Sequence, residues 1–291
     1  MQDSDEEPPC SKEVEEFLKG RGYVIGEKIS YGSYGKVYKA VRFDEEIAVK
    51  VINLKNTSRE TRNKFLPRET FALKTLRHKN VIVVHDIFTL TNKIYIFMSL
   101  GRGDLIDVLE KNGAFQEEQC KILFKEIVDG LEFVHNHGLT HRDLKVDNIL
   151  LDKNGHAIIT DFGFARRVYD KVDGRRVLAE TYCGTTAYIA PEVLEQKPYN
   201  PQMADVWSLG VVLYLMMNDT FPFDDNDDKK MLIAQQNRDY VIEQNWSSEL
   251  KDLIAKMLEP NLQERITVPQ ILAHPWLAGV ENKTPQLITD T

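Results

Sequence analysis

The chain has 291 residues, of which 42% are hydrophobic and 28% are charged, so it is long enough for one large domain or for two lobes. Its 37 basic and 45 acidic residues give a net charge of −8, which argues against non-specific binding to nucleic acid. The three cysteines cannot all pair and none has metal-ligand spacing, so we expect a reducing compartment.

The first residues are acidic and contain Pro8 and Pro9, with no apolar region behind them, so we expect no signal peptide. Residues 1–22 are predicted to be an acidic disordered tail, with one helical turn at Glu13–Lys19. The longest apolar stretch, Val206–Met217, is too short to span a bilayer and is predicted to be a buried helix.

Residues 23–100 are predicted to be rich in strands, with one helix. The strands are expected where apolar and polar residues alternate or apolar residues run together, at Tyr23–Ser30, Lys36–Val41, Ile47–Ile52, Val81–Phe88 and Lys93–Met98. The helix is indicated by residues at helical spacing, namely Phe65, Glu69, Ala72, Leu73 and Leu76.

Residues 101–277 are predicted to be mostly helical. A long amphipathic helix is expected through Cys120, Leu123, Phe124, Ile127, Leu131 and Val134, ending at Gly138. Two further helices are indicated, one by Leu250, Leu253, Ile254, Met257 and Leu258 and a short one by Ile271, Leu272 and Trp276. The fold class is therefore α+β with two lobes, 23–100 and 101–277, followed by a tail at 278–291. Clefts between lobes are common ligand sites.

The most informative stretch runs from residue 139 to residue 163. Two short apolar runs, Ile149–Leu151 and Ala157–Ile159, flank a turn rich in Asp, Asn and Gly, which predicts a hairpin. Its ends carry Asp143 and Asn148 on one side and Asp161 on the other. Carboxylate and amide oxygens held together in this way suit a magnesium ion that binds phosphate.

The order of these residues identifies a family. His141-Arg142-Asp143, then Lys145 and Asn148, then Asp161-Phe162-Gly163 resemble the catalytic and metal-binding loops of eukaryotic protein kinases. A buried polar cluster without chemistry would require five unrelated coincidences in order. The resemblance covers residues 23–277 and implies an N-lobe with a small antiparallel sheet and one helix, and a larger helical C-lobe.

The resemblance implies that the chain transfers the γ-phosphate of ATP and uses ATP and Mg²⁺. Asp143 would be the catalytic base, Lys145 would contact the γ-phosphate, and Asn148 and Asp161 would bind the metal. Asp205 would support the backbone of the catalytic loop.

ATP would be bound by residues from both lobes. By position these are Ile29, Gly32, Gly35, Val37, Ala48, Lys50, Glu69, Met98 and Leu150. Lys50 and Glu69 match the ion pair that positions the α- and β-phosphates, and Phe97 is the alternative to Met98 at the back of the adenine pocket. Ser30 is at the position where the family has its first glycine, so we expect this loop to bind the nucleotide more weakly.

Several positions imply a serine/threonine kinase. Lys145 differs from the tyrosine-kinase pattern, and Thr185 matches the residue that bonds to the base and lysine. Ala190-Pro191-Glu192 closes the segment that would bind the peptide, with Glu192 paired to Arg265 in a buried ion pair.

Three further functional residues follow from the resemblance. Asp104 and Asp147 match acidic positions that meet basic residues of the substrate in basophilic relatives. Thr181 is predicted to be the activating phosphosite, with Arg142 and Arg166 receiving the phosphate.

The stretches Phe65-Leu-Pro-Arg-Glu69, Thr181-Tyr-Cys-Gly and Pro191-Glu-Val-Leu194 are most similar to testis-specific serine/threonine kinases, within the calcium/calmodulin-dependent kinase group. That resemblance implies a role in spermatids. We expect protein substrates, an upstream activating kinase, a monomer, no nucleic-acid or membrane partner, and a cytoplasmic location, with the nucleus as the alternative.

Two other functions stay open at this point. A pseudokinase scaffold is favoured only by Ser30, because the residues needed for catalysis are present. A small-molecule kinase of related fold is disfavoured by Ala190-Pro191-Glu192 and the long segment before it, which would form a shelf for a peptide.

Overall fold

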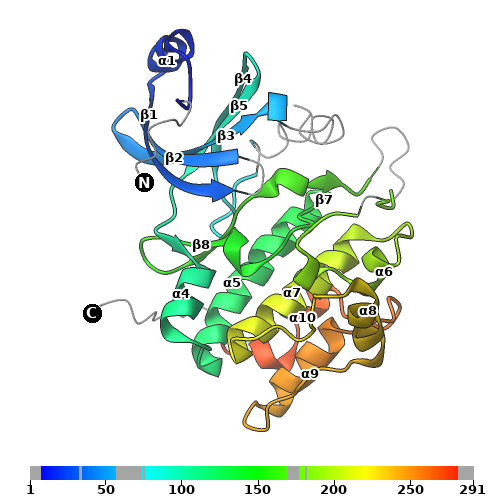
Figure 1. Ribbon diagram of the computed structural model, residues 1–291. Helices are drawn as coiled ribbons and strands as arrows, with labels where there is room; N and C mark the ends of the chain where they lie inside the picture. The colour runs from blue at the N-terminus through cyan, green and yellow to red at the C-terminus, as the bar shows by residue number, and fades with distance from the viewer. Residues whose placement is uncertain are drawn as a thin grey trace. The chain divides into compact units, whose positions relative to one another are not determined.

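A computed structural model describes residues 8–32, 35–56, 74, 76–169, 177–180 and 182–280 (Figure 1). The chain forms two compact units, and the division between them falls at Leu100–Gly101. Residues 78–81, which the lobe division at 100 would put in the first unit, belong to the second. Backbone pairing explains this assignment, because Ile159 N donates to Asn80 O at 2.9 Å and Val81 forms a parallel bridge with Ile159.

The smaller unit is built on a five-stranded antiparallel sheet. Its strands are β1 (Tyr23–Gly32), β2 (Gly35–Arg42), β3 (Glu45–Asn53), β4 (Val84–Leu90) and β5 (Lys93–Ser99), in the order β1-β2-β3-β5-β4. A 3₁₀ turn, η1 (Leu54–Asn56), follows β3. The sheet is confirmed, whereas the helix predicted over Phe65–Leu76, including Glu69, lies outside the described residues except for Lys74 and Leu76.

The helical turn expected at Glu13–Lys19 is confirmed and is part of a longer helix, α1 (Lys12–Lys19), so the prediction of disorder is wrong for this segment of the tail. Ser11 caps this helix, because its hydroxyl accepts from the backbone N–H of Val14. Val14 and Leu18 lie four residues apart on one helical face and are buried in the apolar cluster of the sheet. Charged composition suggested disorder, but these two side chains provide the apolar surface that orders the segment.

The larger unit is mainly helical. Its helices are α4 (Leu105–Asn112), α5 (Glu117–Asn136), α6 (Pro191–Leu194), α7 (Pro201–Asn218), α8 (Asp228–Asn237), α9 (Ser248–Met257) and α10 (Val268–Leu272). The predicted helices near Cys120, Leu250 and Ile271 are confirmed as α5, α9 and α10, although Trp276, predicted to belong to the last of them, lies in a separate 3₁₀ turn after α10. Helix α7 is buried along nearly its whole length, as expected for Val206–Met217. None of the helices in the described parts of the chain is long and apolar enough to cross a membrane.

Short strands and 3₁₀ turns connect these helices and carry most of the motif residues. The strands are β6 (Gly103–Asp104), β7 (Leu139–Thr140), β8 (Ile149–Leu151), β9 (Ala157–Ile159) and β10 (Arg166–Arg167). The turns are η2 (Val146–Asn148), η3 (Phe162–Phe164), η4 (Thr186–Tyr188) and η5 (Pro275–Leu277). The predicted hairpin is confirmed, since β8 and β9 pair antiparallel with Ile149 opposite Ile159.

Candidate active site

The backbone of the loop from His141 to Asn148 is hydrogen-bonded to a buried carboxylate of α7, that of Asp205. Asp205, which is 1% exposed, accepts the backbone N–H of His141 at 2.9 Å and that of Arg142 at 2.7 Å. His135 Nε2 lies 2.8 Å from the same carboxylate. Arg142 has a φ of 64°, a left-handed conformation that is unfavourable for a non-glycine residue, so these bonds stabilise a strained turn just before Asp143.

His141 connects this loop to the strand that leads to Asp161. Its Nε2 lies 2.7 Å from the carbonyl oxygen of Thr160, and its Nδ1 lies 3.3 Å from the backbone N–H of Asp143. A carbonyl can only accept and an N–H can only donate, so one neutral tautomer, with the proton on Nε2, satisfies both contacts. Phe162 packs edge-on against the imidazole. The sequence motif contained His141 but did not indicate this role.

The carboxylate of Asp143 is oriented by three donors. Its Oδ1 accepts from the backbone N–H of Thr185 at 3.0 Å and from the Thr185 hydroxyl at 3.1 Å. Its Oδ2 lies 3.3 Å from the amide nitrogen of Asn148. Asp143 is 6% exposed, so the protein itself determines the direction of this carboxylate. That arrangement suits a group which must meet a substrate hydroxyl in one geometry.

Asn148 and Asp161 are placed at the two ends of the β8–β9 hairpin, where Thr160 N donates to Asn148 O at 2.9 Å. The amide nitrogen of Asn148 faces two acceptors, Asp143 O and Oδ2, so its amide oxygen is turned away from them. Asp161 is in a left-handed conformation, with φ 56°. An amide oxygen and a carboxylate are the hard ligands that Mg²⁺ prefers, so this donor set fits the predicted metal.

Lys145 is half-buried and immediately precedes η2, where its carbonyl accepts from the backbone N–H of Asn148 at 3.0 Å. Its backbone therefore belongs to the same hydrogen-bonded loop as Asp143.

Leu150, one of the predicted ATP-binding residues, lies in β8 of the same unit and is half-buried, next to Gly101.

In the smaller unit the strand register aligns several of the predicted ATP-binding residues. Val37 is opposite Lys50 across β2 and β3, and Ala48 is opposite Met98 across β3 and β5. Directly paired residues share a face, so these four side chains lie on one face of the sheet. Phe97 lies on the opposite face within the apolar cluster, and the register therefore favours Met98 over it.

The glycine-containing turn is only partly described. Gly32 pairs with Gly35 at the end of the β1–β2 ladder, and Ile29 is on the exposed part of β1. A Cβ added to Gly35 would lie 2.3 Å from the carbonyl oxygen of Val51, so this position requires glycine for close approach of the backbones. Glu69, the predicted partner of Lys50, lies outside the described residues.

Thr181 also lies outside the described residues. The two arginines predicted to receive its phosphate belong to neighbouring segments, since Arg166 in β10 pairs with Thr140 in β7, two residues before Arg142. Their backbones are therefore close to each other and to the catalytic loop.

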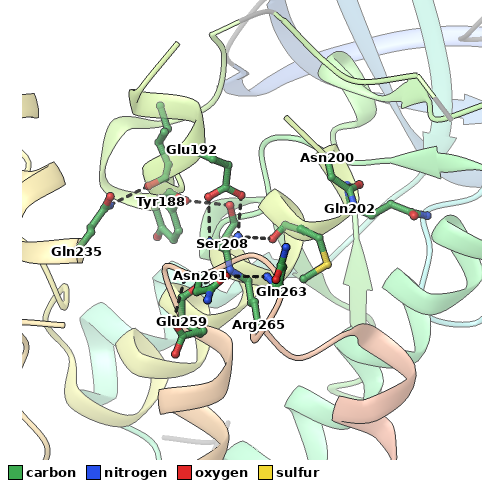
Figure 2. A network of polar contacts seen from close by, with 12 residues as sticks. Tyr188, Glu192, Asn200, Gln202, Ser208, Gln235, Glu259, Asn261, Gln263 and Arg265 are labelled. Atoms are coloured by element: carbon green, nitrogen blue, oxygen red, sulfur yellow. Dashed lines mark hydrogen bonds and ion pairs between the residues drawn. The ribbon is translucent and has the colours of Figure 1, made fainter. Parts of the chain in front are cut away.

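The predicted ion pair between Glu192 and Arg265 is confirmed (Figure 2). Two parallel bonds of 2.7 and 2.9 Å join the guanidinium to the carboxylate. Arg265 also donates to the carbonyl oxygens of Glu259 and Met203 and lies over the ring of Trp207. This buried arginine, with four hydrogen bonds, anchors the segment that ends in Ala190-Pro191-Glu192.

Asp104 and Asp147 lie near each other in the larger unit. Burial raises the pKa of Asp104 above its usual value, and the neighbouring carboxylates of Asp107 and Asp147 raise it further. The site therefore carries a concentration of negative charge that an added cation would offset.

Comparison with known proteins agrees with this geometry. The family model described as the protein kinase domain matches residues 23–277. Testis-specific serine/threonine-protein kinase 2 of Mus musculus is 41% identical, over 89% of this chain and 74% of the relative. Testis-specific serine/threonine-protein kinase 3 of Mus musculus is 40% identical, over 91% of this chain and 100% of the relative. CBL-interacting protein kinase 5 of Oryza sativa subsp. japonica is 32% identical, over 87% of this chain and 55% of the relative.

The chain therefore belongs to the protein kinase family and is a protein serine/threonine kinase, similar to the testis-specific kinases.

Proposed function

We propose that the chain is a catalytically active kinase that transfers the γ-phosphate of MgATP to serine or threonine side chains of proteins. The observation that carries this proposal is the orientation of the Asp143 carboxylate by Thr185 and Asn148. The substrate hydroxyl oxygen forms a bond to the γ-phosphorus as the bond to the bridging oxygen of ADP breaks, and Asp143 accepts the hydroxyl proton.

The other loop residues support that transfer. Lys145 contacts the γ-phosphate and offsets the charge that develops on it. Asn148 and Asp161 would hold the magnesium ion, which would neutralise charge on the phosphate oxygens. In the smaller unit, Lys50 contacts the α- and β-phosphates, with Glu69 as its partner.

The alternative is a pseudokinase that serves as a scaffold. Only Ser30 favours it, while Lys50, Asp143, Asn148 and Asp161 are all present. The test is phosphate transfer from radiolabelled ATP to a generic basic protein, with the Asp143→Asn variant as the control. Incorporation by the parent and not by the variant supports catalysis, whereas no incorporation by either favours the scaffold.

We further propose that phosphorylation of Thr181, by an upstream kinase or by the chain itself, activates the enzyme. A phosphate adds about −1.5 to −2 charge and strong acceptors, which form charge-assisted bonds with arginines. Arg142 and Arg166 are the candidates, because their segments lie together beside the catalytic loop. Bonds from the phosphate to these arginines would fix the position of Asp161 and of the peptide-binding segment that ends at Glu192.

The preferred substrates are proposed to carry Arg or Lys on the N-terminal side of the target residue. The raised pKa of Asp104 supports this, because burial and, to a lesser extent, the carboxylates of Asp107 and Asp147 make its ionised form less favourable, which a substrate cation would offset. A guanidinium can pair with a carboxylate through two bonds, which gives directional recognition in a partly buried site.

In the cell we propose a monomer that acts in the cytoplasm, or in the nucleus, of developing sperm cells. The support for the cell type is the name of the relatives, which are testis-specific kinases. Immunostaining of testis sections tests the location, and light scattering of the purified chain tests the monomeric state.

A further inference from the structure

The turn η4 connects the candidate catalytic base to helix α8. Thr185, just before the turn, donates twice to Asp143. Ile189, just after the turn, has its carbonyl oxygen held at 2.9 Å by the side-chain amide of Gln235 in α8. The turn itself is closed by the bonds Tyr188 N to Thr185 O and Ile189 N to Thr186 O. Five consecutive residues thus span from the carboxylate to α8.

Gln235 is completely buried, with 0% of its surface exposed. Its amide nitrogen bonds to Ile189, but within the described part of the chain its amide oxygen has no hydrogen-bond partner. A buried, unpaired amide oxygen costs free energy that an apolar side chain of the same size would avoid. Stability alone therefore does not account for glutamine at this position, whereas its bond to Ile189 does.

Two other contacts hold the same segment. The Ser208 hydroxyl, from α7, donates to the carbonyl oxygen of Tyr188 at 2.9 Å, and Figure 2 shows Ser208 and Gln235 approaching the segment from two different helices. Before the turn, burial raises the pKa of Tyr182, and the carboxylate of Asp228, the first residue of α8, raises it further. Helix α8 therefore meets the segment on both sides of η4.

From this arrangement we propose that Gln235 is a positioning residue for phosphate transfer to protein substrates. By holding the Ile189 carbonyl, Gln235 fixes the position of residues 185–189, so that a bound peptide places its hydroxyl next to Asp143. The inference rests on the proposed catalytic role of Asp143 and on the peptide-binding role of this segment. It assigns to α8, which contributes no motif residue, a role in protein phosphorylation and none in ATP binding.

The test compares Gln235→Met with Gln236→Met. Gln236 is the neighbouring residue on α8 and is exposed, and its side-chain amide donates to Glu195 at 3.2 Å, so it controls for the loss of an amide from the same helix. For Gln235→Met we expect peptide kcat/KM to fall by about tenfold or more, as for a misplaced substrate. The KM for ATP and the slow hydrolysis of ATP by water should stay near those of the parent. Gln236→Met should match the parent in all of these.

Two results would overturn the inference. One is peptide kinetics of Gln235→Met equal to those of the parent. The other is an equal loss of peptide phosphorylation and ATP hydrolysis together with a lower melting temperature, since that pattern describes a structural role. If the parent itself transfers no phosphate, the proposed activity fails, and affinity for a fluorescent peptide then tests the positioning role. Unchanged peptide affinity in Gln235→Met would contradict it.

Discussion

Thr185 donates both its backbone N–H, at 3.0 Å, and its hydroxyl, at 3.1 Å, to one carboxylate oxygen of Asp143. The two residues are 42 positions apart, so the direction of the carboxylate depends on where the segment that carries Thr185 packs. This contact links the position of Thr185 to the geometry of the catalytic loop.

Replacement of Thr185 by valine keeps the shape of the side chain and the backbone donor but removes the hydroxyl donor. We expect kcat to fall by about ten- to a hundredfold, because the carboxylate loses one of its orienting bonds. The KM for ATP should change little. Thr185→Ser, which retains the hydroxyl, is the matched control and should keep most of the activity. Equal kcat values for the valine variant and the parent would argue against this role.

Asp143→Asn removes the proton acceptor and nearly preserves the size of the side chain. Since a general base contributes about 10²–10⁴-fold to a rate, kcat should fall by that factor. Binding of MgATP, measured by calorimetry, should stay close to that of the parent. Turnover within a few-fold of the parent would mean that another group accepts the proton.

Thr181→Ala should prevent activation. The variant and the parent are incubated with MgATP, and also with an upstream kinase if the parent does not phosphorylate itself. The intact mass of the variant should then show one phosphate fewer than that of the parent. Its rate of peptide phosphorylation should stay at the level measured before incubation. Thr186→Ala is the neighbouring control. If the phosphate maps to another residue and Thr181→Ala is as active as the parent, the segment is regulated at that other residue. Modification of Thr185 is disfavoured, because its hydroxyl is bonded to Asp143.

Asp104→Asn should raise stability at neutral pH while weakening binding of basic substrates. Burial and nearby carboxylates raise the pKa of Asp104, so the ionised side chain is less favourable in the folded protein than in the unfolded chain. That penalty is present in full at neutral pH, decreases as the pH falls through the raised pKa, and is gone below the ordinary pKa of an aspartate. Asparagine keeps an oxygen that can cap α4 in place of Asp104 Oδ1, which accepts from Asp107 N at 2.9 Å.

Melting temperatures of the parent and of Asp104→Asn should therefore differ at neutral pH and converge in acid. A positional peptide library should show a weaker preference for Arg with the variant. A library in which the parent has no preference for basic residues would reject the proposed substrate class.

Leu18→Ala should destabilise the smaller unit, although Leu18 precedes the region matched by the kinase family model. Leu18 is fully buried against the sheet, and a leucine-to-alanine change at such a site costs about 2–5 kcal/mol. Denaturant unfolding measures the change in the free energy of unfolding. Glu16→Ala, at an exposed position of α1, is the control and should have almost no effect. Equal stability of both variants would mean that α1 contributes little.

The sequence by itself determined the family and most of the motif residues. Asp143, Asn148 and Asp161 were identified because local spacing and the turn between two apolar runs predict a hairpin that carries them. The strands of the smaller unit and helices α5, α7 and α9 followed from periodicity and apolar runs, which are also local properties. These features depend on neighbours within about twenty residues, so they are visible without a structure.

Tertiary structure decided what depends on contacts between distant positions. Charged composition predicted a disordered tail with a single helical turn at residues 13–19, but packing against the apolar face of the sheet orders residues 12–19 as the helix α1. The register of β3 with β5 distinguished Met98 from Phe97. No spacing pattern indicated Gln235, because its partner Ile189 is 46 residues away and meets it only once α8 has packed against the segment. The physical reason is that a hydrogen bond depends on the position of two atoms in space, which sequence separation does not supply.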